Sequence, residues 1–161
     1  MSQSGIPILN DKYIATMDLY PQEAKEFTRI YPFYENLRAK KFTTTRCLSC
    51  GAISFPPRVV CPTCNSSDLQ WIELPSEGKV IRFSEEVVGV PLGWDSPIIH
   101  AYVDLGAVKI LSRISNCALS QLKDGDTVRL VVYEVPPVMI DVKGGVKEAP
   151  RVFFAFEPVN K

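Results

Sequence analysis

The sequence lacks a surplus of either charge. Its 161 residues contain 18 Lys and Arg and 18 Asp and Glu, so the formal net charge is zero. Proteins that bind nucleic acids strongly usually carry a basic excess, because they must neutralise phosphates. The charge balance therefore argues against a strong nucleic-acid binder, although a local basic face would still be compatible with it.

Long apolar runs and targeting signals are also lacking. There is no stretch of 18 apolar residues, so no membrane-spanning helix is predicted. The opening residues, MSQSGIPILNDKY, do not combine a basic region with an apolar stretch, so we expect no secretory signal. These absences predict a cytoplasmic protein with no membrane partner. In that compartment paired cysteines favour metal or redox chemistry over structural disulfides.

Histidine is scarce, and His100 is the only one in the chain. No nucleophile accompanies it in a pattern typical of a catalytic pair. The sequence therefore predicts no catalytic residue and a protein that is not an enzyme. An acyl-transferring thiol at Cys117 is the alternative, but a lone cysteine in a short helical segment is more simply a small buried hydrophobe.

Cysteine, in contrast, is concentrated in one segment. Four of the five cysteines form two C-x-x-C pairs, Cys47 with Cys50 and Cys61 with Cys64. Zinc prefers four sulfur or nitrogen ligands in a tetrahedron, and two such turns can each present two sulfurs to one ion. The spacing therefore predicts one metal ion bound by all four thiolates. Zinc is the expected ion, and iron is the alternative because a four-thiolate shell also holds iron.

The segment between the two pairs is apolar and has Phe55-Pro56-Pro57-Arg58 at its centre. The two prolines favour an extended backbone and remove two hydrogen-bond donors. We expect Phe55 to pack on the barrel or on the N-terminal helices. Two interpretations of Arg58 stay open: it belongs to a packing edge, or it anchors an anionic ligand or a partner carboxylate.

Periodicity divides the chain into three predicted parts, which are an N-terminal helical segment (1–43), the cysteine module (44–70) and a β domain (71–161). In the first part, apolar residues recur at helical spacing from Phe27 to Leu37. Pro32 interrupts this stripe and is expected in the first turn of a second helix, which would run from Pro32 to Lys41. The stripe either covers the rest of the protein or offers a partner surface.

The third part alternates with period two. The predicted strands are 80–90, taken as one bent strand, 98–105, 108–114, 127–135 and 152–157, with a short helix at 116–122. Five strands with a helix between the third and the fourth is the layout of an OB-fold, a five-stranded barrel. A small β-sandwich is the alternative. The predicted fold class is mostly β with N-terminal helices.

Several motifs together resemble a known family. They are Tyr34 to Leu37, Lys41 to Arg46, the two cysteine pairs, the Phe55-Pro56-Pro57-Arg58 strip, Gly78-Lys79-Val80, Pro97 to Leu105 and Gly125-Asp126-Thr127-Val128. They resemble the rubredoxin-like zinc ribbon plus OB-fold family of archaea and bacteria, also called domain-of-unknown-function 35. The sequence looks like an archaeal member, with one departure: Asn65 stands where rubredoxin has glycine.

The resemblance implies N-terminal helices, a zinc ribbon and an OB-fold barrel. It also implies a non-catalytic, acyl-CoA-associated accessory subunit that docks a thiolase or a hydroxymethylglutaryl-CoA synthase type of enzyme. Lipid metabolism and isoprenoid synthesis are the implied settings. A single-stranded nucleic-acid-binding protein is the alternative, because zinc ribbons and OB-folds occur there too.

Candidate ligand or partner residues follow from the predicted barrel. OB-folds bind on the face of strands 2 and 3, between two loops. Here the loops would be 89–97 and 136–147, and the outward positions of the strands mix cations with aromatic rings that could hold phosphates and an adenine. The candidates are Trp94, His100, Tyr102, Lys109, Arg113, Arg129, Lys143 and Lys147, with Phe55 and Arg58 of the ribbon. A solvated outer face is the alternative.

Overall fold

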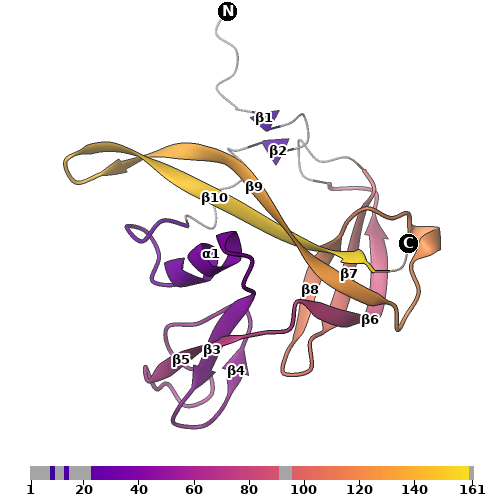
Figure 1. The fold of residues 1–161 in the computed structure, drawn as a ribbon, viewed down its shortest axis with the longest axis horizontal. Helices are drawn as coiled ribbons and strands as arrows, with labels where there is room; N and C mark the ends of the chain where they lie inside the picture. Colours follow the sequence, from indigo (N-terminus) through magenta and orange to yellow (C-terminus); the bar gives the residue numbers. More distant parts are fainter. Residues whose placement is uncertain (1–7, 10–12, 15–22, 91–95, 160–161) are drawn as a thin grey trace, which may run out of the picture.

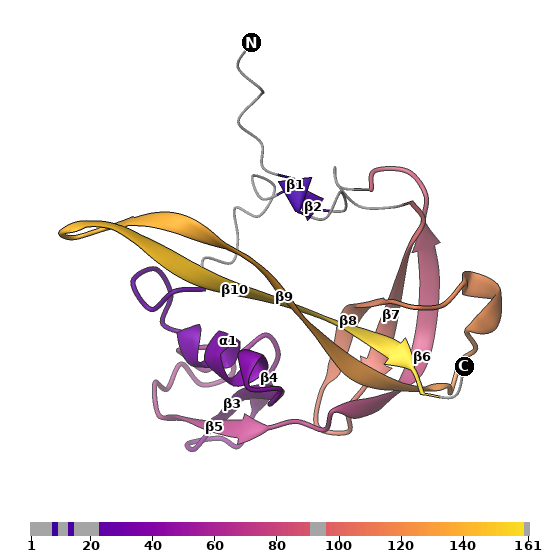
Figure 2. The same ribbon diagram turned by 45° about the horizontal axis from the view of Figure 1, so that its top comes forward.

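The computed structural model describes residues 23–90 and 96–159, together with the backbone of two short paired strands, β1 (Ile8–Leu9) and β2 (Tyr13–Ile14). A three-stranded sheet, one α-helix and a barrel make up the rest, and two barrel strands extend into a long arm (Figures 1 and 2). The mostly β class is confirmed. No helix in the described part of the chain is long and apolar enough to cross a membrane.

Helix α1 (Tyr31–Arg38) is shorter than predicted. Pro32 lies in its first turn, as expected, and the buried side chains are Phe33, Tyr34 and Leu37. The described residues before it form turns, and Phe27 is 47% exposed, so the predicted first helix is wrong there. Pro32 is tolerated in the first turn because its missing N–H has no partner within the helix there, and the helix begins only one residue before it, at Tyr31. The short strands β1 and β2 are a further departure from the helical prediction for residues 1–43.

The cysteine module is built on a small antiparallel sheet. Its strands are β3 (Thr43–Cys47), β4 (Ile53–Ser54) and β5 (Leu69–Glu73), in the order β4-β3-β5. Strand β3 runs directly from the helix into the first cysteine, and β5 returns from the second pair. The sheet therefore brings the two C-x-x-C turns to the same end.

The remaining strands form a closed barrel in the order β10-β8-β7-β6-β9. Their bounds are β6 (Glu77–Glu86), β7 (Ile98–Asp104), β8 (Lys109–Ile114), β9 (Thr127–Val142) and β10 (Gly145–Pro158). A short 3-10 helix, η2 (Leu119–Gln121), lies between β8 and β9, within the predicted helical segment. Five strands are found where five were predicted, but β6 ends at Glu86, so the second half of the predicted bent strand is mostly not strand.

The last two strands are much longer than predicted. Residues 136–147 were expected to form a loop, but β9 and β10 stay paired as far as Val142 and Gly145. They form an arm that projects beyond the barrel, and α1 lies between this arm and the ribbon sheet (Figure 1). The pairing shifts register once. Between the pairs Ala149–Val138 and Arg151–Val135, β10 advances by two residues and β9 by three. Pro136 and Pro137 lie in the segment of β9 that contains the extra residue. Proline has no backbone N–H, so it suits a position where regular pairing is interrupted.

One hydrophobic core runs through all three parts. It includes buried residues of α1 and of every barrel strand, and the partly buried Phe55 and Trp71 of the ribbon pack against it. At its centre Phe42, 1% exposed, contacts the rings of Phe33, Phe55, Phe154 and Phe156 at centroid distances of 5.1–6.1 Å. The predicted inward residues of β7, including Ala101 and Val103, are buried in the same core. The ribbon and the helix are therefore packed on the barrel.

Candidate functional site

The two C-x-x-C turns have the same backbone geometry. The N–H of Gly51 donates to the carbonyl of Cys47, and the N–H of Asn65 donates to the carbonyl of Cys61, both at 2.9 Å. Each turn has a residue with positive φ directly after its second cysteine: Gly51 (77°) in the first turn and Asn65 (58°) in the second. Asparagine tolerates this left-handed conformation better than most side chains. Asn65 is therefore no conformational departure from the glycine that rubredoxin has.

The four sulfurs converge at one point. The Sγ atoms of Cys47 and Cys64 lie 3.6 Å apart, as do those of Cys50 and Cys61, and all four lie within 4.8 Å of one another. A tetrahedron of sulfurs at the zinc–sulfur distance of about 2.3 Å has edges of about 3.8 Å. The donor set therefore fits a tetrahedral metal ion, and the predicted four-cysteine metal centre is supported.

The sulfurs influence one another's ionisation. The backbone N–H of Cys64 lowers the pKa of Cys61 most, burial opposes it, and the N–H of Thr63 adds to the lowering, so that this pKa falls to about 6. The N–H of Ser66 lowers the pKa of Cys64, but the sulfurs of Cys50 and Cys47 outweigh it and raise that pKa to about 12. Deprotonation of one sulfur therefore makes deprotonation of its neighbours less favourable, and a bound cation would let all four stay deprotonated.

Three consecutive threonines hold the surroundings of the centre in place. The Oγ1 of Thr43 accepts a hydrogen bond from Asn36 of α1 at 3.2 Å, and the hydroxyl of Thr44 donates to the carbonyl of Ser54 in β4. The Oγ1 of Thr45 accepts from the N–H of Arg58 at 2.9 Å and lies 3.2 Å from its carbonyl. All three are buried. Strand β3 therefore fixes the helix, the hairpin strand and the strip between the cysteine pairs.

The strip itself has one inward and one outward residue among the candidates. Phe55 packs against Phe33 of α1, Phe42 before β3 and Phe154 of β10, so it contacts both the helix and the barrel strand, as expected. Arg58 is exposed, and no ion pair joins its side chain to any residue in the described ranges. Its backbone is fixed by Thr45, so the guanidinium projects from a rigid base.

Four of the predicted ligand residues share the outer face of two neighbouring barrel strands. His100 lies opposite Arg113, Tyr102 lies opposite Leu111, and Asp104 lies opposite Lys109. Tyr102 and Leu111 are 52% and 58% exposed, so the face is open. The Nε2 of His100 lies 2.9 Å from the Oε2 of Glu86, which places a carboxylate beside this face. The alternation of β7 and β8 therefore brings His100, Tyr102, Lys109 and Arg113 together.

The other candidates lie elsewhere. Arg129 in β9 is ion-paired with Glu157 of β10 at 2.7 Å. Lys143 lies in the turn of the arm, and Lys147 is paired with Glu26 at 2.8 Å. The outer part of the arm points away from β6, β7 and β8 (Figure 1). Trp94 lies outside the described residues. The predicted set is therefore spread over separate surfaces.

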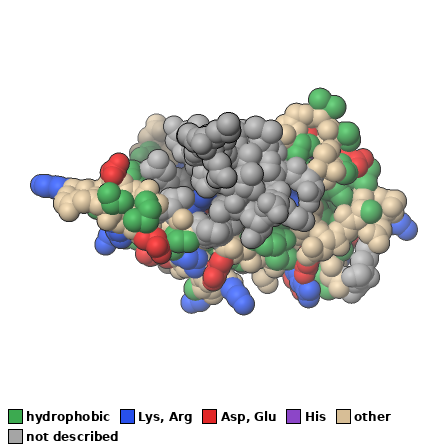
Figure 3. Space-filling model, turned by 90° about the horizontal axis from the view of Figure 1, so that it is seen from above, with side chains coloured by type: hydrophobic (Ala, Val, Ile, Leu, Met, Phe, Trp, Pro, Cys, Tyr) green, Lys and Arg blue, Asp and Glu red, His purple; other side chains and the backbone are tan. Residues whose placement is uncertain are grey.

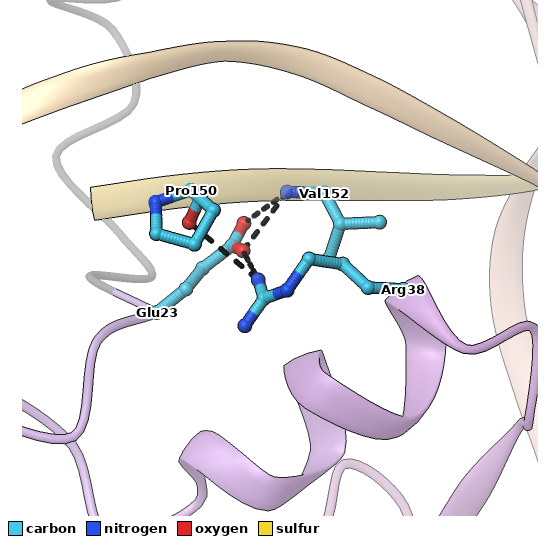
Figure 4. A network of polar contacts seen from close by, with 4 residues as sticks. All are labelled: Glu23, Arg38, Pro150 and Val152. Carbon is cyan, nitrogen blue, oxygen red and sulfur yellow. Dashed lines mark hydrogen bonds and ion pairs between the residues drawn. The ribbon is translucent and has the colours of Figure 1, made fainter. Parts of the chain in front are cut away.

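A polar network that the sequence did not predict supports the arm. Both carboxylate oxygens of Glu23 accept from the N–H of Val152, at 2.9 and 3.1 Å, and Oε2 lies 3.2 Å from Arg38 (Figure 4). Arg38 also reaches the carbonyl of Pro150 at 3.5 Å. Burial raises the pKa of Glu23 to about 7, although the N–H of Val152 and the charge of Arg38 lower it. No local pattern marks Glu23, because Val152, whose N–H it accepts, is 129 residues away in sequence.

Comparison with known proteins agrees with this architecture. The family description "ChsH2, rubredoxin-like zinc ribbon domain" matches residues 37–70. The chain is 32% identical over 99 residues to the benzoylsuccinyl-CoA thiolase subunit BbsA of Thauera aromatica, covering 61% of this chain and 67% of that protein. It is 29% identical over 98 residues to a DUF35 domain-containing scaffold protein of Methanothermobacter thermautotrophicus, covering 58% of this chain and 72% of that protein.

A solved structure shows the same fold at low sequence identity. The structure titled "Ltp2-ChsH2(DUF35) aldolase" superimposes with a TM-score of 0.61 and 18% identity, over 86% of this chain and 98% of that one. Ribbon, helix and barrel therefore occur together in a second protein. With the sequence similarity and the four-cysteine centre, this shows that the chain belongs to the family of rubredoxin-like zinc-ribbon proteins with the DUF35 domain.

Proposed function

We propose that this protein is a non-catalytic accessory subunit that docks a thiolase-type acyl-CoA enzyme, with hydroxymethylglutaryl-CoA synthase as a second enzyme of the same kind. The observation that carries the proposal is the similarity to BbsA, which is itself named a subunit of a thiolase. The proposal places the protein in the cytoplasm and in acyl-CoA chemistry such as lipid metabolism or isoprenoid synthesis.

The chemistry of the described residues supports an accessory role. Four thiols converge on one centre and are needed there as metal ligands. The single histidine is hydrogen-bonded to Glu86 on the outside of the barrel. Cys117 packs against the hydrophobic core as a half-buried side chain. The five thiols and the one histidine therefore all have contacts within the folded chain.

We further propose that the ion is zinc and that its role is structural. Four thiolates leave no open coordination position for a substrate, and a closed tetrahedral set is typical of structural zinc. Elemental analysis of the purified protein tests this. One zinc per chain is expected. One iron per chain, with visible absorbance, would contradict the zinc assignment and support iron instead.

The outer face of β7 and β8 is the proposed contact for acyl-CoA. Tyr102 offers an exposed ring to an adenine, and Arg113 and Lys109 on the neighbouring strand offer cations to phosphates. Arg58 is kept as a second candidate anchor, for an anionic ligand or a partner carboxylate. Calorimetry with free CoA tests the face: Tyr102→Ala is expected to weaken binding, whereas Arg129→Ala, on an ion-paired residue outside the face, is expected to leave it unchanged.

The division into an N-terminal segment (1–43), a zinc ribbon (44–70) and an OB-fold domain (71–161) also remains a proposal. The strand order and the short helix η2 support the OB-fold assignment. The shared core argues that the three segments unfold together as long as the metal is bound. A single cooperative unfolding transition by calorimetry would agree with this, and separate transitions would contradict it.

Docking is tested by co-expression with the thiolase-type enzyme of the same organism. The two proteins are expected to co-purify and to elute together in size-exclusion chromatography. A chain that elutes alone, and that binds no CoA by calorimetry, would contradict the proposed function.

A further inference from the structure

The arm formed by β9 and β10 is an unusual surface for a small barrel protein. Its outer part, residues 137–149, is a two-stranded ribbon, whereas the barrel pairings of β9 with β6 and of β10 with β8 lie at the other end, near Val128 and Phe156. A two-stranded hairpin is only marginally stable by itself in water. Its rigid extension therefore needs support from the rest of the protein.

One face of the arm receives that support. Ala149 is 3% exposed, and Lys147, two residues earlier on the same side of β10, pairs with Glu26 at 2.8 Å. Glu23 caps the open edge of β10 at Val152 (Figure 4). These contacts fix the inner face toward the segment before α1. They leave the opposite face of the arm toward solvent.

The outward face combines two exposed apolar side chains with two carboxylates. Met139 and Val146 are 64% and 63% exposed. Glu148 lies opposite Met139, and Asp141 lies opposite Val146, so alternation places all four on one face. Figure 3 shows hydrophobic side chains between acidic ones toward the outer end of the molecule on this side. Of the two lysines in the outer arm, Lys147 belongs to the inner face and Lys143 lies in the turn.

We infer that this outward face of the arm, defined by Met139, Asp141, Val146 and Glu148, is the surface that docks the acyl-CoA enzyme. The inference rests on the proposed function and names the part of this chain that makes the contact. Its occupant is a protein surface with an apolar hollow bordered by Lys or Arg. Apolar anchors surrounded by complementary charges give an interface both affinity and register.

Charge favours this occupant over a second copy of the chain. A twofold contact would place the same patch against itself, so that Asp141 and Glu148 would meet carboxylates of the other copy. Like charges brought together in this way oppose association. A basic rim on a different protein removes that repulsion and adds attraction.

The test uses full-length protein and the thiolase-type enzyme of the same organism, with affinity measured at low and at physiological salt. The M139S/V146S variant is expected to bind about tenfold more weakly or worse. The D141N/E148Q variant is expected to lose most of the salt dependence of the wild type. The control V87S/V88S changes a pair that is also exposed, at 62% and 89%, and is expected to bind as the wild type does.

Each outcome decides the inference. Arm variants that bind like the wild type would overturn it and leave the proposed function standing, whereas a wild-type chain that does not bind the enzyme would overturn both. Sedimentation of the chain alone tests whether a second copy binds this face. A wild-type dimer that becomes a monomer in M139S/V146S would overturn the inference and assign the face to a second copy. All substituted side chains are exposed, and unchanged melting temperatures verify that the variants are folded.

Discussion

The ring of Phe55 meets the ring of Phe154 edge to face, with centroids 6.2 Å apart and planes inclined at 89°. This contact joins the strip between the cysteine pairs to a barrel strand about 100 residues later in the chain. Phe42 touches both rings, so the contact belongs to a continuous aromatic cluster. The segment between the cysteine pairs therefore packs, through these rings, against the part of β10 at the base of the arm.

A double-mutant cycle measures this connection. Phe55→Leu and Phe154→Leu, singly and combined, are expected to show a coupling of about 0.5–1.5 kcal/mol in the free energy of unfolding, because edge-to-face aromatic pairs contribute this much beyond buried area. A cycle of Phe55→Leu with Leu111→Ala, a 58% exposed residue of the barrel face, serves as the control and should be additive. Additivity in both cycles would show that the rings do not interact.

The hydroxyl of Thr45 is expected to matter more than its shape. Thr45→Val keeps the volume but leaves the N–H of Arg58 without its acceptor, and the expected loss is about 1–3 kcal/mol in urea unfolding. Thr45→Ser keeps the hydroxyl and should lose less. Equal stability of the two variants would show that water replaces the hydroxyl at no cost.

The positive φ of Asn65 gives a prediction about the second C-x-x-C turn. Asn65→Gly is expected to retain stability, whereas Asn65→Val is expected to lose about 1–2 kcal/mol, because a left-handed backbone is strained for a β-branched residue. The same order is expected in the rate at which a chelator extracts the metal. Indistinguishable Gly and Val variants would contradict the left-handed conformation at this position.

Glu23 makes stability depend on pH. Its pKa is about 7 in the folded protein against 4.5 as the ordinary value, so the folded state holds this proton more tightly than the unfolded state. The contribution is fully present below about pH 4.5 and is lost as the pH rises through 7. The free energy of unfolding of the wild type should therefore fall relative to that of Glu23→Gln between these pH values.

The Glu23→Gln variant keeps an acceptor for the N–H of Val152, which makes it the matched comparison. Glu23→Ala removes the acceptor and should be less stable than Glu23→Gln at every pH. The contradicting result is a free energy of unfolding of the wild type that stays constant or rises relative to that of Glu23→Gln as the pH increases. It would show that Glu23 is already ionised at low pH in the folded protein.

Metal removal should act locally. Chelation is expected to abolish the hydrogen-exchange protection of the Gly51 and Asn65 amides, whose hydrogen bonds close the two cysteine turns. The barrel strands are paired with one another and not with the ribbon, so the amides of Ala101 and Val103 should stay protected. Loss of both sets in one step would show that the aromatic cluster carries the unfolding into the barrel.

The features that the sequence predicted well are local ones. Ligand spacing alone identified the four cysteines, and alternation alone identified which residues of β7 face the core and which face outward. Both depend on a period or a spacing within a few residues. Phe55 was likewise expected to pack inward, next to two prolines that favour an extended backbone and remove two hydrogen-bond donors.

The features it predicted poorly depend on distant partners. Prolines and glycines between residues 136 and 147 are typical of a loop, yet the two segments pair with each other across a two-residue turn. The predicted helix before Pro32 failed because apolar spacing alone does not distinguish a helix from turns: Ile30 packs against the core from a turn, and Phe27 is 47% exposed. The ligand candidates were drawn from outward strand positions, two loops and the ribbon strip, but Arg129 and Lys147 have ion-pair partners on separate surfaces.

The register shift at Pro136 and Pro137 separates the pairing of the arm from the pairing of the barrel. Residues beyond it can be added or deleted without disturbing the strands that close the barrel. Because side chains alternate, removing two residues from each strand would keep the same side chains outward and shorten the arm by about 6.8 Å. Reach is therefore a dimension that can be adjusted in steps, so a single barrel and metal ribbon could be fitted to partner enzymes of different size.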